Sequence, residues 1–321
     1  MVLIAISEVQ CGGNPTGPSN PPAITLTCPG AQTIASASGL AIAVTYASPT
    51  AAGGSAPITI TCTPSSGAEY PIGSTMVTCN AVDAKRQTAS CGFGVTVTAP
   101  PRISVTRYVA FGDSITEGLP HAFRPQLIVA PPDSYPAVLQ GLLSARYTAQ
   151  TIDVLDEGVG GEIVSAGLER LPGVLNFDRP GALLLMEGAN DLNAFGSAGI
   201  DSIVSGLRQM IRNGRGRSMS VFVGTLLPQR ENSPKASFPE LVVPANDRIR
   251  PMIAEEGAIL VDLHQAFGGI PDPLLISSDG LHPTAAGNAK IAQAFYDAIR
   301  ARLETSSASG LSAAPSSRVR F

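Results

Sequence analysis

Two patterns of apolar and polar positions divide the chain near residue 105. Before that point, short runs rich in Thr, Val, Ile and Ala recur at close intervals, with turn residues such as PSSG and YPIGS between them. Several short strand-like runs separated by Gly, Pro and Ser predict a β-sandwich. The runs are AITLTC, AIAVTYA, ITITCTP, STMVTCNAVDA and CGFGVTVTA.

After residue 106, strand-like runs alternate with helical patterns. The predicted strands are RYVAFG, TIDVLDEG, ALLLMEG, SVFVGTLLP and AILVDL. Helices are expected at about 135–147, 163–170, 199–213, 245–256 and 284–302. In the last of them the apolar positions recur with helical spacing and keep one face. This alternation is typical of βαβ units and predicts an α/β fold with a largely parallel sheet.

These patterns predict two domains and two flanking segments. Residues 1–22 are expected to be a signal remnant or linker, 23–100 the β-sandwich, 106–304 the α/β domain and 305–321 a disordered tail. The stretch APPRISVT, residues 99–106, is expected to join the domains. A chain of 321 residues with 44% hydrophobic content is long enough for a sizeable core.

Charge and hydropathy exclude two classes of partner. The formal net charge is −4 and no basic patch occurs, so nucleic acid is not an expected partner. No apolar run approaches the roughly 18–20 residues that a membrane span needs. The remaining expectation is a small-molecule substrate.

The cysteines point to an oxidising compartment. Four of them fall within the strand-rich segment, without a CxxC pair, so a zinc site is not expected. Two disulfides are the preferred interpretation, with three pairings open, and they indicate a location outside the cytoplasm. Four buried free thiols are the alternative. The four are Cys28, Cys62, Cys79 and Cys91.

The fifth cysteine, Cys11, leaves two interpretations open. It follows the short apolar run MVLIAIS and precedes a Gly/Pro/Ser linker, which is the layout of a lipid-anchored bacterial lipoprotein. However, the run lacks a basic region, and the residues before Cys11 fit a lipidation box poorly. The alternative is a flexible tail with one leftover thiol.

Four short motifs fall at the carboxyl ends of predicted strands, where reactive sites of open α/β sheets form. FGDSITEG follows the first strand, DEGVGGE the second and EGAND the third. DGLHP lies after the fifth strand, before the last helix. One such motif is common by chance, whereas four in this order indicate an active site.

These motifs make residues 106–304 resemble the SGNH/GDSL hydrolases, a family of esterases and lipases with a flavodoxin-like three-layer α/β/α fold. The resemblance implies that Ser114 is the nucleophile, that Gly161 and Asn190 belong to the oxyanion hole, and that Asp279 and His282 complete the triad. One position departs from the family pattern: the glycine block usually begins with Asn, and this chain has Asp156 there.

The chemistry of each residue supports these implied roles. A serine hydroxyl needs a base, and His282 has a carboxylate three residues upstream that can orient its ring. The backbone N–H of Ser114, the backbone N–H of Gly161 and the Asn190 amide can stabilise an oxyanion. For His282 the alternative is a helix-entry residue, and for Asn190 a loop cap. His121, His264, Asp113, Asp191 and Asp262 are expected to be structural or solvated.

Residues 23–99 resemble the hyalin repeat (HYR) module, an immunoglobulin-like β-sandwich. The stretches that carry the resemblance are TCPG, VTYASPTA, ITCTPSSGAEYPIGSTMVTCNAVDA and SCGFGVTVTAP. Such modules accompany extracellular proteins and have been linked to adhesion, so the resemblance implies a spacer or an attachment to the cell surface. It names no ligand.

The expected function is therefore a secreted, periplasmic or lipid-anchored serine esterase. The loops at 119–134 and 226–240 are expected to border the pocket, and neither contains a long apolar run, which favours short acyl groups such as acetyl groups on carbohydrate. No cofactor and no metal are expected, because no His/Cys/Asp/Glu cluster has ligand spacing. The alternatives are a lysophospholipase or thioesterase of the same family, or an adhesion protein whose hydrolase domain is inactive.

Overall fold

A computed structural model describes residues 22–118 and 132–305, which form two compact units. The first extends to Ala99 and the second begins at Pro100. The expected signal remnant up to residue 21, the cysteine at position 11 and the expected tail beyond 305 lie outside the described residues. Among the helices within the described ranges, none is long and apolar enough to cross a membrane.

The first unit consists of short, mostly antiparallel strands, as its turn-rich sequence predicts. Strands β2, β8, β7 and β5 form a four-stranded sheet in that order, while β1 pairs with β4 and β3 with β6. Only alternate residues of β7 and β8 are buried, which is the pattern of a sheet with one face toward a core. The strands are β1 (Thr25–Thr27), β2 (Gln32–Ala35), β3 (Ile42–Ala43), β4 (Thr50–Ala52), β5 (Thr59–Thr63), β6 (Glu69–Tyr70), β7 (Gly73–Val82) and β8 (Thr88–Thr98).

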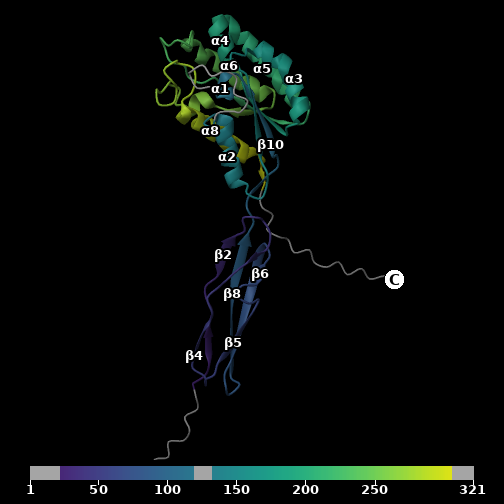
Figure 1. The fold of residues 1–321 in the computed structure, drawn as a ribbon, viewed down its shortest axis with the longest axis vertical. Helices are drawn as coiled ribbons and strands as arrows, with labels where there is room; N and C mark the ends of the chain where they lie inside the picture. Colours follow the sequence, from purple (N-terminus) through teal and green to yellow (C-terminus); the bar gives the residue numbers. More distant parts are fainter. Residues whose placement is uncertain (1–21, 119–131, 306–321) are drawn as a thin grey trace, which may run out of the picture. The chain divides into compact units, whose positions relative to one another are not determined.

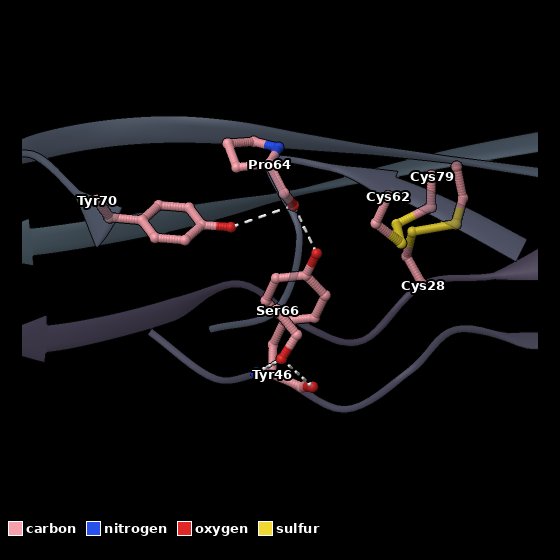
Figure 2. Close-up of a disulfide and its surroundings, with 8 residues drawn as sticks. Cys28, Tyr46, Cys62, Pro64, Ser66, Tyr70 and Cys79 are labelled. Carbon is pink, nitrogen blue, oxygen red and sulfur yellow. Dashed lines mark hydrogen bonds between the residues drawn. A yellow bond between two sulfur atoms is a disulfide. The ribbon is translucent and has the colours of Figure 1, made fainter. Parts of the chain in front are cut away.

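Two disulfides cross-link this unit, as the cysteine pattern predicts (Figure 2). Cys28 pairs with Cys91, and Cys62 pairs with Cys79, which stands opposite it on the neighbouring strand. Beside the bridges, the hydroxyls of Tyr46 and Tyr70 both donate to the carbonyl of Pro64, at 2.6 and 3.4 Å. The two bridges lie at a small core that includes Val77, Phe93 and Val95.

The second unit is built on a five-stranded parallel sheet with the order β11-β10-β12-β13-β14. This is the flavodoxin-like order. The second strand, β11, lies on one side of the first strand, β10, and the later strands β12, β13 and β14 follow on its other side. Together with the β-rich first unit, it confirms the predicted fold class. The strands are β10 (Arg107–Gly112), β11 (Asp153–Gly158), β12 (Ala182–Met186), β13 (Ser220–Gly224) and β14 (Ile259–Val261).

Helices cover both faces of this sheet and make a three-layer domain (Figure 1). Tyr108 and Ala110 of β10 pack with α2 and α8, while Val109 and Phe111 pack with α3, α5 and α6. Successive side chains of a strand point to opposite faces, so a strand that is covered on both sides reads as a continuous apolar run. The helices are α2 (Tyr135–Arg146), α3 (Val164–Asp178), α5 (Gly199–Arg215), α6 (Val242–Glu255) and α8 (Ala285–Leu303).

The helix boundaries differ from the sequence expectation mainly at prolines. Helix α3 continues through Pro172 to Asp178 instead of ending near 170, and α6 begins at Val242, with Pro244 in its first turn. Proline is tolerated in a first helical turn, where its missing N–H has no partner to lose. Three short helices lie outside the predicted helix ranges: α1 (Ser114–Glu117), α4 (Ala189–Phe195) and α7 (Leu263–Ala266).

The expected linker is partly a strand of the second unit. Strand β9, Arg102–Ile103, pairs antiparallel with β15, Glu304–Thr305. Ile103 is buried, and its N–H donates to Oε1 of Gln150 at 2.8 Å. A two-residue strand gives no periodic signal, so the sequence pattern could not reveal it.

Candidate active site

Ser114 is the first residue of the single helical turn α1, which follows β10 after a tight turn. Gly112 is required before it, because a Cβ there would collide with the carbonyl oxygen of Met186. Asp113 caps α1 by accepting the N–H of Ile115 at 2.9 Å. Ser114 follows the carboxyl end of β10, and 8% of the residue is exposed.

His282 and Asp279 lie on the loop that precedes α8, and they face Ser114. Nε2 of His282 lies 2.8 Å from Oγ of Ser114, and Nδ1 lies 2.5 Å from Oδ2 of Asp279. With Nδ1 protonated toward the carboxylate, Nε2 is left to accept the serine proton. The structure thus brings together the three residues that the spacing of DGLHP and the GDS turn singled out.

Asp279 is fully buried and held in its ionised form. Burial alone would raise its pKa, but hydrogen bonds outweigh it and keep the pKa of this carboxyl well below its usual range. The donors are the ring of His282, the hydroxyl of Ser277 and the N–H groups of Leu281 and His282. The carboxylate therefore stays charged through the neutral range, where it can stabilise an imidazolium.

The segment at 226–240 holds this loop in place. The N–H of Arg230 donates to the carbonyl of Gly280, and that of Lys235 to the carbonyl of Asp279, both at 2.9 Å. Gly280 has φ of 87°, and a Cβ on it would collide with the side chain of Ser233. Only glycine fits this close approach and left-handed backbone. The prediction that 226–240 forms a rim of the site stays a prediction, but the segment does brace the acid.

The two remaining predicted residues, Gly161 and Asn190, follow β11 and β12, the strands on either side of β10. Gly161 follows β11 with φ of 78°, and its Cα faces open space. Nδ2 of Asn190, in the first turn of α4, donates to the carbonyl of Glu162 at 2.8 Å and lies 3.5 Å from Oδ2 of Asp113. One amide proton thus braces the glycine loop, and the second has only a long contact, so it is open to a substrate oxygen.

A group of buried carboxyls beneath these loops was missed by the sequence reasoning. Glu162 and Glu187 are 8% and 2% exposed, and they lie among Asp113 and Asp191. Arg170 of α3 pairs with Glu162 through two hydrogen bonds of 2.8 and 2.7 Å, and also donates to the carbonyl of Glu157. One signal was present in the sequence: Glu187 is an acid directly after the apolar run ALLLM.

Asp156, where the family pattern has Asn, is also a buried acid. Its Oδ1 accepts the N–H of Gly158 at 3.0 Å, whereas its Oδ2 has no hydrogen-bond partner. Burial raises the pKa of Asp156 to about 7, and the nearby charges of Glu117 and Glu157 add to the shift. The departure therefore puts a titrating group beside the glycine loop in place of a neutral amide.

The other candidates of the sequence have structural contacts. Asp191 accepts the N–H of Val164 at the start of α3, and Asp262 caps α7 and pairs with Arg250 at 2.9 Å. His264 lies in α7, and its N–H donates to Thr225. His121 lies outside the described residues. Within the described ranges, no group of three or more His, Cys, Asp or Glu side chains is arranged to hold a metal ion.

Two hollows adjoin the carboxyl edge of the sheet. A cavity of about 10 Å³ is lined by Asp113, Glu187 and Gln229 together with apolar side chains such as Met186 and Leu281. An open groove of about 500 Å³ lies next to it, lined by residues of the 228–243 and 264–273 segments. Most of the other expected rim, 119–134, lies outside the described residues.

Comparison with family models identifies both parts of the chain. Residues 110–290 match the GDSL-like lipase/acylhydrolase family, and residues 19–97 match the HYR domain. The first match contains the Ser114 turn, the glycine loop, Asn190 and the DGLHP loop.

Solved structures with the same fold match the second unit. The lipase/acylhydrolase from Enterococcus faecalis is 22% identical, with 61% of this chain and 96% of that chain covered and a TM-score of 0.51. An alpha/beta hydrolase enzyme from the metagenome of Lake Arreo, Spain, is 22% identical, with 60% and 94% covered and a TM-score of 0.50. An acetylxylan esterase from Geobacillus stearothermophilus is 23% identical, with 60% and 94% covered and a TM-score of 0.50. No curated protein matches the chain.

Proposed function

Because this chain belongs to the GDSL-like lipase/acylhydrolase family and is a carboxylic ester hydrolase, we propose that Ser114, His282 and Asp279 are its catalytic triad. The observation that carries the proposal is the unbroken set of contacts from Oγ of Ser114 through the ring of His282 to Asp279, at 2.8 and 2.5 Å. These distances lie within hydrogen-bond reach, which a nucleophile, its base and the orienting acid need.

In the proposed reaction, Oγ of Ser114 attacks the ester carbonyl and its proton passes to Nε2 of His282. Asp279 remains ionised and stabilises the imidazolium. Collapse of the tetrahedral intermediate breaks the ester bond, and His282 gives its proton to the departing alcohol, leaving an acyl-enzyme. Water, deprotonated by the same histidine, then attacks the acyl group and releases the carboxylic acid and free Ser114.

The oxyanion of each tetrahedral intermediate is proposed to accept hydrogen bonds from three donors. They are the backbone N–H groups of Ser114 and Gly161 and the side-chain amide of Asn190. The open space at Gly161 and the second amide proton of Asn190 support this assignment. Donors that are fixed before the substrate arrives need no reorganisation when charge develops on the oxygen.

We propose short acyl esters, acetyl groups on carbohydrate among them, as the substrate class. The small exposed fraction of Ser114 and the absence of a long apolar run in the segments 119–134 and 226–240 support this class. An acetylxylan esterase shares the fold, which makes acetylated xylan the first polymer to test.

The test is a chain-length series of p-nitrophenyl esters, from acetate to palmitate, on the purified full-length protein. We expect kcat/KM to be highest for acetate or butyrate and to fall with each longer chain. A maximum at the long chains would replace the short-acyl proposal by a lysophospholipase or lipase. Ser114→Ala serves as the background control, and hydrolysis of every ester in that variant at the wild-type rate would reject the triad.

We also propose that the protein works outside the cytoplasm, with its HYR domain as a spacer or attachment module. The two disulfides support this location, because such bonds persist in oxidising compartments. When cells are lysed under denaturing conditions with an alkylating agent and no reductant, the protein should show at most one free thiol as an alkylated cysteine, that of Cys11. Four or five free thiols would contradict export.

A further inference from the structure

Glu187 is the most enclosed unpaired acid in the described part of the chain. It follows the last residue of β12 and is 2% exposed, yet neither of its carboxyl oxygens has a hydrogen-bond partner. It also lines the cavity of about 10 Å³, where Oε1 of Gln229 has no partner either. An ionised carboxylate in such a place would carry a large desolvation cost, which proteins avoid by keeping the group neutral.

The carboxyl of Glu162 lies near that of Glu187 and interacts with it. Oε2 of Glu162 and Oε1 of Glu187 lie 3.1 and 3.2 Å from the position that a Cβ on Gly167 would take. Both carboxyls, together with Cε of Met210, therefore border the space left by the missing side chain of Gly167 on α3. Arg170 donates two hydrogen bonds to the carboxyl of Glu162, one to each oxygen. Two facing carboxyls with one cation are stable when one of them keeps a proton.

We propose that Glu187 is protonated in the working enzyme and donates a hydrogen bond to the Glu162 carboxylate, thereby positioning the oxyanion loop. This bond gives a partner to an oxygen that otherwise has none and removes the repulsion between the two acids. Burial, the charge of Asp113 and the interaction with Glu162 all raise the pKa of Glu187 well above its ordinary value, in agreement with the geometry.

The charged and titratable groups around Glu187 come from four parts of the fold. Asp113 directly precedes α1, and Asp191 lies in α4. Glu162 lies just before α3, and its partner Arg170 lies within α3. Tyr135 of α2 is neutral, because burial holds its pKa far above the usual range. Burial raises the pKa of Asp113 to about 7 and also raises that of Asp191. Each of the two accepts a backbone N–H, from Ile115 and Val164, and these bonds favour the ionised form. Glu187 accepts no such bond, so the proton is assigned to it.

The link to catalysis runs through the backbone of Glu162 and rests on the proposed function. Glu162 directly follows Gly161, and its carbonyl accepts the amide of Asn190 at 2.8 Å. A fixed Glu162 side chain thus fixes both proposed oxyanion donors. Glu187 touches no substrate in this scheme and acts only through Glu162, as a positioning residue.

The first test measures thermal stability against pH for wild type and Glu187→Gln, with Glu169→Gln, an exposed acid of α3, as the matched control. A carboxyl whose pKa is raised on folding loses its contribution to stability as pH rises from the unfolded value toward the folded one. Glutamine has no such loss. We therefore expect the Tm of Glu187→Gln minus that of wild type to grow by at least about 2–4 °C between pH 5 and pH 8. A constant difference, as expected for Glu169→Gln, would overturn the proposal. If Glu187→Gln does not fold, Glu187→Met replaces it.

The second test measures the protonation of Glu187 and its effect on catalysis in two separate experiments. The infrared difference spectrum between wild type and Glu187→Gln at pH 7 should contain the carbonyl stretch of a protonated carboxylic acid, and its absence would overturn the assignment. On p-nitrophenyl acetate, Glu187→Leu, which cannot donate, should lose about tenfold in kcat with KM unchanged, and Glu187→Gln should recover most of that loss. Equal losses in both variants would reject the positioning role. A wild type with the infrared band but without esterase activity would instead count against the proposed function.

Discussion

The two units of this protein are stabilised in different ways. In the first, strands bury alternate residues around a small core that includes Val44, Tyr70 and Val97, and two disulfides cross-link it. In the second, the sheet is covered on both faces by two large apolar clusters. A small domain buries a smaller fraction of its surface than a large one, so cross-links contribute more to its stability.

The difference also explains where the chemistry lies. The thick core of the second unit can hold Glu162, Glu187, Asp113 and Asp191 away from water, at a cost that its apolar packing offsets. The first unit has one buried acid, Asp83, within its described residues, and three backbone N–H groups satisfy it. We therefore expect changes in the first unit to affect stability and changes in the second to affect catalysis.

The largest expected effect is that of Ser114→Ala. Loss of the nucleophile should lower kcat on p-nitrophenyl acetate by about 10⁴-fold or more, with the Tm of both units unchanged, because only one oxygen atom is removed. Ser205→Ala, an exposed serine of α5, is the control and should keep the wild-type rate. Activity of Ser114→Ala within tenfold of wild type would show that the chemistry lies elsewhere.

The next effect is that of Asn190→Ala. Removal of one oxyanion donor should lower kcat by about 100- to 1,000-fold, or about 2.7–4 kcal/mol, with KM nearly unchanged. Because the same amide also bonds the Glu162 carbonyl, a fall in Tm should accompany the loss. Asn176→Ala on the exposed side of α3 controls for the substitution itself. A lower Tm with a normal rate per folded molecule would leave Asn190 only the role of a loop cap.

Removal of a disulfide should act on the first unit alone. Replacing Cys28 and Cys91 by Ser opens a bridge between residues 63 apart, and should destabilise that unit by about 2–4 kcal/mol. Replacing Cys62 and Cys79, which are 17 apart, should cost less, because the loop it closes is shorter. Calorimetry on each double variant measures the stability of the first unit, and kcat is measured in parallel on the same protein. A loss of hydrolysis that follows the loss of stability would mean that the units are not independent.

The smallest expected effect is that of deleting the first unit. A fragment that begins at Pro100 should keep most of the kcat on small soluble esters, since the four motifs lie beyond that point. A fragment that begins at Val105 is the matched control. It lacks β9 and the buried Ile103, so its Tm should be lower than that of the longer fragment. An inert but folded Pro100 fragment would show that the first unit contributes to the site.

The sequence alone predicted the fold class and grouped the candidate site residues. Alternating apolar runs and helical patterns report the parallel sheet directly, because burial on both faces requires continuous apolar strands. The Asp279 and His282 pair could be proposed because the two residues are three apart, so a single turn suffices to bring them together. That Ser114 would lie near them was expected from its place at the carboxyl end of a strand of the same sheet. The catalytic roles themselves stay predictions.

Only the tertiary structure decided how distant segments meet. It selected the pairs Cys28–Cys91 and Cys62–Cys79 among three pairings, and it placed Gly280 against Ser233 and β9 against β15. It also brought Glu187 beside Glu162, although β10 separates the strands β12 and β11 that precede them in the sheet. Local patterns record whether a residue is buried or exposed, but a buried acid is identified only by what surrounds it. Those surroundings come from several helices and strands at once, so their packing, and not the sequence pattern of any one of them, determines which groups share a proton.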